Sequence, residues 1–417
     1  MSNTGASNTG VSDAALPLPY EGLRVLDLSQ GIAGPYCAGL LSMQGAQVVK
    51  IEPPGGDWIR AAGGGQEGMT ALTIMGNLGK RSACIDVTKP AGRDLVLGMA
   101  RQADVFLQNM RPGVIERLGL AYETLASENP ALIYLSITGF GPRGPDAKKA
   151  GTDSVLQAYT GMAHINREAD GTPRRVPFLV PDTTTAVYAA QAVGAALYAR
   201  HKSGRGRHLQ VSLMAACAAL QAGPIIDEAI TGGKPVPPIT VPAGIFRTRD
   251  GYMTVTSLNE NMFAALMKVL GLEALGADPR YAELANRQQN AKSLNAEVAR
   301  CLATQDTAHW LRQFAVADVL SAEAVDFAGF RASPQAVAMD VFSAIDQYPY
   351  GPLPMPRVPG GNSDWPIGAT PRVGEHTLDV LAEAGLSAEE CAALIKSGIA
   401  VQAPGPHEAR QPQSVTA

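Results

Sequence analysis

The chain has 417 residues, of which 46% are hydrophobic and 17% are charged, and its formal net charge is −4. These values are typical of a soluble globular protein with two domains or one elaborated domain. They exclude a basic nucleic-acid-binding surface, and no apolar run is long enough to span a membrane. The five cysteines and six histidines lie far apart, so we expect reduced thiols, no metal site and a cytoplasmic location.

The first elements form a predicted βαβ unit. Residues 23–28 and 47–52 read as strands, and the stretch between them reads as a helix that ends at about residue 44. This order implies a parallel strand pair with a right-handed crossover. The turn before the helix contains Gly31 and Gly34, but the full Gly-x-Gly-x-x-Gly pattern is absent and Pro35 follows. NAD binding is therefore the weaker alternative.

Strands and helices continue to alternate to about residue 213. Further strands are expected at residues 83–87, 104–108 and 132–137. The pattern predicts a doubly wound, largely parallel α/β domain, in which ligands bind at the carboxyl ends of the strands. Three loops fall at those ends, at residues 32–33, 109–111 and 139–141. The basic pair Lys80-Arg81 precedes a strand, and we expect both side chains to lie on a solvated face.

The second half predicts a smaller α+β domain. Residues 246–256 read as a hairpin around Arg249-Asp-Gly251, helices follow, and residues 348–364 are expected to be irregular. Two short helices, at about 376–384 and 388–396, close the fold. The predicted parts are a disordered leader (1–17), the N-terminal part of the large domain (18–230), a linker with the small α+β domain (231–330), a return segment with C-terminal helices that pack on the large domain (331–405), and a loose tail (406–417).

One acid stands out in the stretch from Thr152 to Leu197. Pro181-Asp182 precedes three threonines and a long apolar run, which is how a helix start looks in sequence. The simple interpretation is that Asp182 caps this helix with its carboxylate. The sharper one is a carboxylate at a positive helix terminus, aimed into a cleft as a nucleophile.

Seven ordered segments resemble the class III CoA-transferases, the formyl-CoA/carnitine-CoA transferase family. They are LRVLDLSQGIAGPYCAGLLSMQGAQVVKIEPPGGDWIR, GNLGKRSACIDV, VFLQNMRPGVIERLGL, YLSITGFGPRGP, GTDSVLQAYTGM, PDTTTAVYAAQAVGAAL and IFRTRDGYMTV. The resemblance spans about residues 20–320. It implies a large α/β domain, a linker and a small α+β domain, in two chains that interlock as a homodimer like linked rings.

The resemblance also implies the site and the reaction. Asp182 matches the catalytic aspartate. By position alone, we expect the backbone N–H groups of Gly139 to Gly141 to serve as oxyanion donors. The implied CoA contacts are Ile32, Ala33, Ile85, Asp86, Val87, Thr88, Asn109, Met110, Arg111, Arg117, Thr152 and Asp153. Acyl-CoA is then a substrate, with no tightly bound cofactor. We expect CoA to pass from a donor such as succinyl-CoA to a small carboxylic acid, through mixed anhydrides and an aspartyl-CoA thioester.

The sequence departs from the better-known members at three places. Ile32 stands where formyl-CoA transferase has a glutamine, Pro53 stands where an arginine would contact the nucleotide, and the shielding glycine loop is reduced to Gly232-Gly233. These departures argue against oxalate and formyl specificity.

Two alternatives to CoA transfer stay open. The α-methylacyl-CoA racemases share the fold and use a histidine in a Gly-His-Asp motif, where this chain has Gly151-Thr152-Asp153. Because threonine cannot accept a proton at neutral pH, Thr152 favours transfer over racemisation. The second alternative is a CoA-binding protein without chemistry, which the setting of Asp182 disfavours.

Overall fold

The computed structural model describes residues 16–168, 170–361 and 364–403. The predicted leader lies outside this range except for its last two residues, and the predicted tail lies wholly outside it. The chain forms two compact units. The first runs to Ala222 and resumes at Phe342, and the second covers Gly223–Val341.

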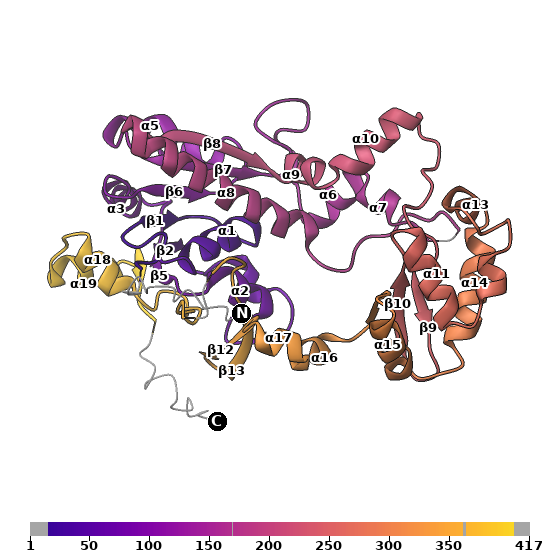
Figure 1. Cartoon of the computed structure of the whole chain (residues 1–417). Helices are drawn as coiled ribbons and strands as arrows, with labels where there is room; N and C mark the ends of the chain where they lie inside the picture. The colour runs from indigo at the N-terminus through magenta and orange to yellow at the C-terminus, as the bar shows by residue number, and fades with distance from the viewer. Residues whose placement is uncertain (1–15, 169, 362–363, 404–417) are drawn as a thin grey trace, which may run out of the picture. The chain divides into compact units, whose positions relative to one another are not determined.

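The first unit is built on a seven-stranded sheet in the order β14-β5-β2-β1-β6-β7-β8 (Figure 1). Its strands are β1 (Arg24–Asp27), β2 (Gln47–Glu52), β5 (Arg81–Ile85), β6 (Val105–Gln108), β7 (Ile133–Thr138), β8 (Arg207–Ser212) and β14 (Ala400–Val401). All neighbours pair in parallel except β14, which runs antiparallel to β5. The predicted βαβ start and the largely parallel sheet are therefore confirmed.

Helices cover both faces of this sheet. One face packs against α1 (Ala33–Ser42), α6 (Asp153–Tyr159), α8 (Val180–Ser203) and α9 (Leu213–Leu220). The other packs against α3 (Pro90–Ala100), α5 (Tyr122–Glu128), α18 (Thr377–Glu383) and α19 (Ala388–Lys396). Successive side chains of a strand point to opposite faces, so Val25 enters the first core and Leu26 the second. This burial on both sides explains why the strands read as nearly continuous apolar runs.

Small elements complete the first unit. They are η1 (Trp58–Ala61), β3 (Gly65–Gln66), β4 (Met69–Thr70), α2 (Ala71–Asn77), α4 (Val114–Arg117), α7 (Met162–Ile165), β12 (Phe342–Gln347) and β13 (Gly351–Pro356). Strands β12 and β13 form an antiparallel hairpin, so the prediction of irregular structure at residues 348–364 is wrong for Gly351–Pro356. Prolines occupy every second position, 352, 354 and 356, and an isolated two-stranded hairpin tolerates them where the missing N–H would face away from the partner strand.

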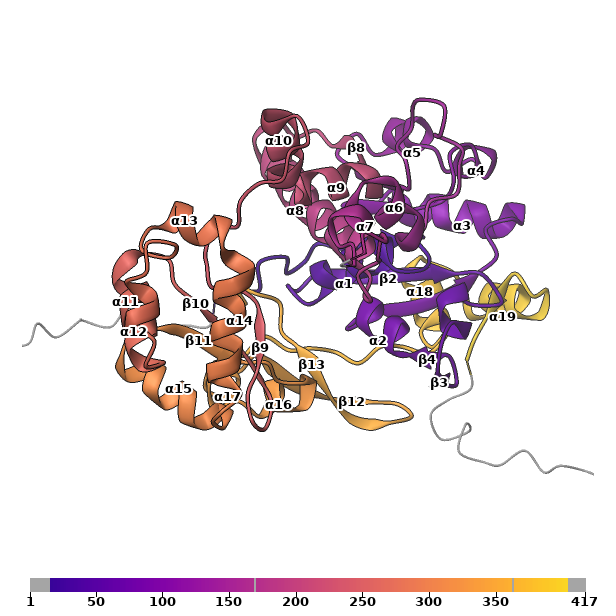
Figure 2. The same ribbon diagram turned by 90° about the vertical axis from the view of Figure 1, so that its right-hand side faces the viewer.

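The second unit holds a three-stranded antiparallel sheet in the order β11-β10-β9 (Figure 2). Its strands are β9 (Ile245–Arg247), β10 (Tyr252–Thr256) and β11 (Leu320–Glu323). Its helices are α10, which starts at the unit boundary (Ala222–Thr231), α11 (Glu260–Val269), α12 (Glu273–Gly276), α13 (Leu284–Gln289), α14 (Ala291–Leu302), α15 (Thr307–Val316), α16 (Phe327–Ala332) and α17 (Pro334–Ala338). The pairing of β9 with β10 confirms the predicted hairpin.

Within the described residues, no single helix combines the length and hydropathy needed to cross a membrane. One pair of consecutive helices, α9 with α10, meets that criterion by length and composition alone.

Candidate active site

Asp182 lies in the first turn of helix α8, which begins at Val180 with Leu179 as its N-cap. The interpretation of Asp182 as the capping residue is therefore wrong, because the N-cap is Leu179, whose side chain makes no capping hydrogen bond. Pro181 fits within the first turn because its missing N–H would have had no partner inside the helix. The helix thus starts before the acid, and Asp182 lies at the positive end of a 24-residue helix.

The carboxylate of Asp182 is poorly compensated. It is only partly exposed and accepts no hydrogen bond from any residue that the structure describes. Burial, together with the neighbouring Asp153 carboxylate, raises the pKa of Asp182 to about 7. An aspartate in this state keeps its proton to a higher pH than an ordinary aspartate does, and its ionised form is weakly solvated.

Asp153 is the residue that contacts Asp182. Its Oδ2 accepts a hydrogen bond from the backbone N–H of Asp182 at 3.3 Å. Its Oδ1 accepts one from Nε2 of Gln157 at 2.8 Å. Asp153 is 6% exposed, and burial raises its pKa as well. The structure thus brings together two residues of the predicted site, Asp182 and Asp153, from the starts of two helices.

Close glycine packing sets the position of Asp153. Gly139 follows strand β7, and a Cβ on it would lie 2.7 Å from the Cα of Gly151. A Cβ on Gly151 would lie 2.6 Å from the Cα of Gly139. Only glycine fits at both positions, and this contact brings the start of α6 to the carboxyl end of β7.

The predicted oxyanion loop is partly engaged. The backbone N–H of Gly141 donates to Oγ1 of Thr138 at 3.1 Å, and the carbonyl of Gly139 accepts the N–H of Met214. The N–H of Gly141 is therefore occupied in this structure.

A second group of predicted residues gathers where β1 and β6 end. The side chain of Asn109 accepts the N–H of Gln30 at 2.8 Å and donates to its carbonyl at 2.6 Å. This reciprocal pair joins the turn that carries Ile32 and Ala33 to the loop that carries Met110 and Arg111. Ile32 and Ala33 are both buried, so a ligand would meet this turn mainly through its backbone.

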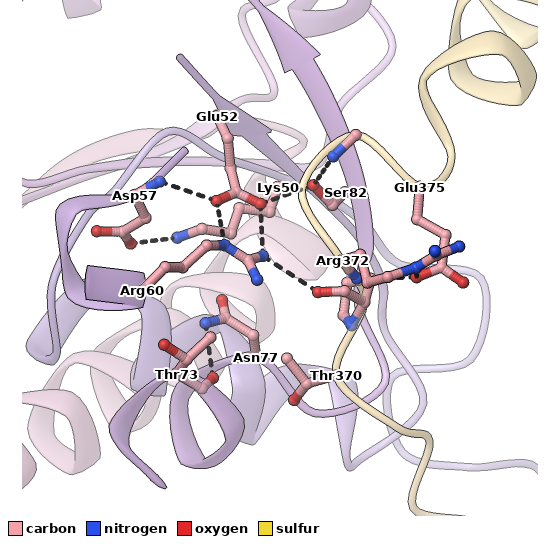
Figure 3. A network of polar contacts seen from close by, with 12 residues as sticks. Lys50, Glu52, Asp57, Arg60, Thr73, Asn77, Ser82, Thr370, Arg372 and Glu375 are labelled. Carbon is pink, nitrogen blue, oxygen red and sulfur yellow. Dashed lines mark hydrogen bonds and ion pairs between the residues drawn. The ribbon is translucent and has the colours of Figure 1, made fainter. Parts of the chain in front are cut away.

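A buried polar network supports the same turn (Figure 3). The carboxylate of Asp57 accepts the N–H of Gly31 at 3.0 and 3.1 Å and pairs with Nζ of Lys50 at 2.9 Å. Lys50 also donates to the carbonyl of Ser29 at 2.9 Å. Gly31 has φ +78°, and a Cβ there would lie 2.7 Å from the Trp58 ring, so the turn requires glycine.

The network extends to the C-terminal segment. Glu52 accepts two hydrogen bonds of 2.7 Å from Arg60, and Ser82 donates to it at 2.6 Å (Figure 3). Arg60 donates further to the carbonyl of Pro371 at 3.1 Å, and Ser82 Oγ accepts the N–H of Gly374. This set of bonds connects the strand ends with the segment that precedes α18.

Lys80 is not solvated. It is 3% exposed and forms an ion pair with Asp27 at 2.8 Å, so the interpretation of a solvated basic pair is wrong for this residue. Burial lowers the pKa of Lys80 to about 8, although Asp27 opposes the shift. Arg81, its neighbour, is partly exposed and pairs with Glu383. Buried charges of this kind persist only when they are paired, which is the reason for the network.

The predicted CoA contacts at residues 85–88 lie at the end of β5, which is four positions from β7 in the sheet order. Ile85 is the last residue of β5 and is fully buried, and Asp86 accepts hydrogen bonds from Thr88, two residues after it. Val87, between them, is half-buried. In the described part of the chain, no hydrogen bond links residues 85–88 to Asp182 or Asp153.

Three further predicted contacts are exposed, namely Arg111, Arg117 and Thr152. Neither arginine forms an ion pair with a described residue, so both guanidinium groups are available to a phosphate. A role for any of these residues in CoA binding stays a prediction.

Gln157, Lys50 and Asp57 were missed by the sequence reasoning. A signal existed for Gln157, because it stands four residues after Asp153 and so shares its helix face. Lys50 and Asp57 gave none, since each stands alone in a strand or a turn. A cavity of about 1260 Å³ between α3, α18 and α19 contains none of the predicted site residues.

Comparisons with known proteins match most of the chain. The model of CoA-transferase family III matches residues 20–377. Acetyl-CoA:oxalate CoA-transferase from Acetobacter aceti is 34% identical over 330 residues, which cover 78% of this chain and 85% of that protein. Succinate–glutarate CoA-transferase from Agrobacterium fabrum is 33% identical over 390 residues, which cover 88% of this chain and 95% of that protein. The crystal structure of a CAIB/BAIF family protein from Brucella suis superposes with a TM-score of 0.79 at 31% identity, covering 88% of this chain and 100% of that one.

Proposed function

The chain belongs to CoA-transferase family III, and on this premise we propose that it moves CoA between carboxylic acids through covalent intermediates on Asp182. As a class III acyl-CoA:carboxylate CoA-transferase, it takes an acyl-CoA and a free acid as its substrates. The proposal adds the nucleophile, the order of steps and the class of acid.

The first half-reaction loads CoA on the enzyme. The Asp182 carboxylate attacks the thioester carbonyl of the donor, which forms a mixed anhydride and expels CoA thiolate. The thiolate then attacks the Asp182 acyl carbon, which releases the donor acid and leaves an aspartyl-CoA thioester. Because the thioester bond is exchanged and never hydrolysed, no ATP is required.

The second half-reaction runs these steps in reverse with a different acid. The acceptor carboxylate attacks the aspartyl thioester, which forms a second mixed anhydride and again frees CoA thiolate. Attack of the thiolate on the acceptor carbonyl gives the new acyl-CoA and restores the Asp182 carboxylate. Water must be excluded throughout, since it would hydrolyse each intermediate.

The single observation that carries this proposal is the state of Asp182. Its carboxylate lies at a helix N-terminus, lacks a hydrogen-bond donor among the described residues, and has its pKa raised to about 7. A carboxylate left without donors keeps its electron density for attack, and a helix terminus still favours its ionised form. A capping aspartate would instead accept backbone N–H groups.

We further propose a small dicarboxylic acid as acceptor, with succinyl-CoA as donor. Arg175 supports this choice, because it is exposed, forms no ion pair with a described residue, and lies close enough to Asp153 to favour the ionised form of that acid. A guanidinium there can bind the second carboxylate of an acid whose first carboxylate approaches Asp182. The relative from Agrobacterium fabrum is named for succinate and glutarate, two acids of this class.

The proposed assembly is a homodimer of interlocked chains. Helix α10 supports a partner, because it has no buried residue, and Ile225, Ile226 and Ile230 on it are 48%, 55% and 76% exposed. An apolar stripe of this kind is expected to be covered in solution. Light scattering that gives the mass of one chain at micromolar concentration would overturn the dimer.

Mass spectrometry of the intact protein tests the nucleophile. After incubation with succinyl-CoA alone, we expect a mass increase equal to CoA less water, which neutral hydroxylamine removes and converts to a hydroxamate on Asp182. The Asp182→Ala variant should form no adduct and transfer no CoA. Transfer by that variant, or α-proton exchange without an acceptor acid, would overturn the proposal.

A further inference from the structure

Gln157 has a buried side chain that bonds both Asp153 and the backbone of the segment before α8. It lies on α6, is 1% exposed, and its amide group uses both its donor and its acceptor ends. Nε2 donates to Oδ1 of Asp153 at 2.8 Å and to the carbonyls of Val176 and Phe178 at 3.3 and 3.2 Å. Oε1 accepts the N–H of Val176 at 2.9 Å.

These bonds connect two segments that meet at Asp182. Asp153 accepts the backbone N–H of Asp182, so Gln157 fixes the acid that holds the nucleophile from one side. Residues 176–178 lead directly into Leu179, the N-cap of α8, so Gln157 also fixes the chain that enters the nucleophile's helix. The side chain of Leu179 makes no capping hydrogen bond, which leaves the contacts of Asp153 and Gln157 to define where α8 begins.

We propose that Gln157 is a positioning residue for CoA transfer, which holds the Asp182 carboxylate in the orientation for attack by clamping Asp153 and residues 176–178 together. The inference rests on the proposed role of Asp182. Gln157 touches no reacting atom in this scheme and acts only through Asp153 and the backbone before α8. Its effect should therefore fall on the covalent step and not on the binding of acyl-CoA.

The amide is the group that this place requires. A side chain must donate to Asp153 and accept from Val176 at once, and neutral amides do both without adding charge beside two carboxyls. A leucine of similar size would fill the volume and remove all four bonds. A glutamate would keep the acceptor for Val176 but would repel Asp153 whenever it is ionised.

The test uses single-turnover formation of the aspartyl-CoA thioester from succinyl-CoA. For Gln157→Leu we expect the rate of adduct formation at saturation to fall about 10- to 100-fold, the range that a displacement of about 1 Å can cause. The acyl-CoA concentration at half-saturation should change less than threefold. A loss of affinity with an unchanged rate would overturn the inference.

Gln157→Glu gives a readout that a merely structural role would not move. At low pH the introduced carboxyl is protonated and donates to Asp153, whereas at high pH it is ionised and repels it. The rate of Gln157→Glu relative to wild type should therefore rise at least threefold as the pH is lowered from 8 to 6. The relative rate of Gln157→Leu should stay constant, and a flat profile for both variants would overturn the clamp.

Gln221→Leu is the matched control. Gln221 is also a buried glutamine that bonds backbone carbonyls, those of Thr160 and Cys217, but it touches neither Asp153 nor residues 176–178. It should lose stability without losing the rate of adduct formation per folded molecule. An equal rate loss in Gln221→Leu and both Gln157 variants would refute the assigned role. Absence of any adduct in the wild type would refute the nucleophile instead, so the two failures are distinct.

Discussion

The backbone N–H of Asp182 donates to Oδ2 of Asp153 across 3.3 Å, so one aspartate holds another at the start of α8. The bond uses a free donor of the helix's first turn, and it brings the carboxyl group of buried Asp153 to that of partly exposed Asp182. The result is a pair in which burial and mutual repulsion both disfavour ionisation, while the helix terminus favours it. The chemistry proposed above depends on this balance.

The first prediction is that adduct formation depends on pH through Asp182. Only the ionised carboxyl attacks, and its pKa is about 7, so the single-turnover rate should rise with pH and reach half its plateau near pH 7. In Asp153→Asn one cause of the raised pKa is gone, and the midpoint should move down by about 1 pH unit. Burial is the larger cause, so the midpoint should stay well above the ordinary 3.8. An unchanged midpoint in this variant would contradict the pairing of the two acids.

A second prediction concerns stability. The folded protein raises the pKa of Asp182 from 3.8 to about 7, so the free energy of unfolding falls as the pH rises from about 4 to 7, and the full penalty is present above pH 7. The neutral isostere in Asp182→Asn should therefore stabilise the protein by about 2 kcal/mol at pH 8, a value halved from the full shift because the group is partly exposed.

The gain from Asp182→Asn should shrink as the pH falls from 7 toward 4, because wild-type Asp182 is then protonated in the folded state. Chemical denaturation of the two proteins at pH 8 and pH 5 measures it. A stabilisation of the same size at both values would show that the effect is not electrostatic.

The sequence was sufficient for the parts of the fold that follow local periodicity. Strand β2 has the predicted bounds, Gln47–Glu52, because apolar residues fill a central strand that is buried on both faces. Strand β5 begins at Arg81 and not at residue 83, because the preceding Lys80 is itself buried against Asp27. A charge normally signals solvent, and its partner stands 53 residues away in the chain.

In the site, too, contacts between residues far apart in the chain could not be predicted from local sequence. Asp182 could be singled out by its setting, but its contact with Asp153 spans 29 residues and depends on two glycines that pack together. Nothing in the local pattern near Asp182 indicates that its carboxylate lacks donors. The helix start was misplaced for a related reason, since Pro181 suits the first turn as well as it suits a position before the helix.

A third prediction addresses the turn between β1 and α1. Asn109 bonds both the N–H and the carbonyl of Gln30, which fixes the backbone proposed to meet CoA. Asn109→Ala should raise the KM for acyl-CoA about tenfold, with a smaller change in kcat, because binding is weakened by about 1.4 kcal/mol. Asn109→Asp keeps the acceptor for the N–H of Gln30, so its KM for acyl-CoA should lie between those of wild type and Asn109→Ala. Equal KM values for wild type, Asn109→Ala and Asn109→Asp would show that this turn does not contribute to the binding of acyl-CoA.

The last prediction tests the class of acceptor acid through Arg175. If its guanidinium binds the distal carboxylate, Arg175→Gln should raise the KM for glutarate about tenfold and leave the KM for a monocarboxylate such as butyrate unchanged. Arg174→Gln is the matched control, because Arg174 is also exposed but is already paired with Glu168. Arg174→Gln should change neither the KM for glutarate nor the KM for butyrate. Steady-state assays with succinyl-CoA as donor supply both constants, and a change for butyrate as large as for glutarate would place Arg175 in general charge attraction and not in recognition of a second carboxylate.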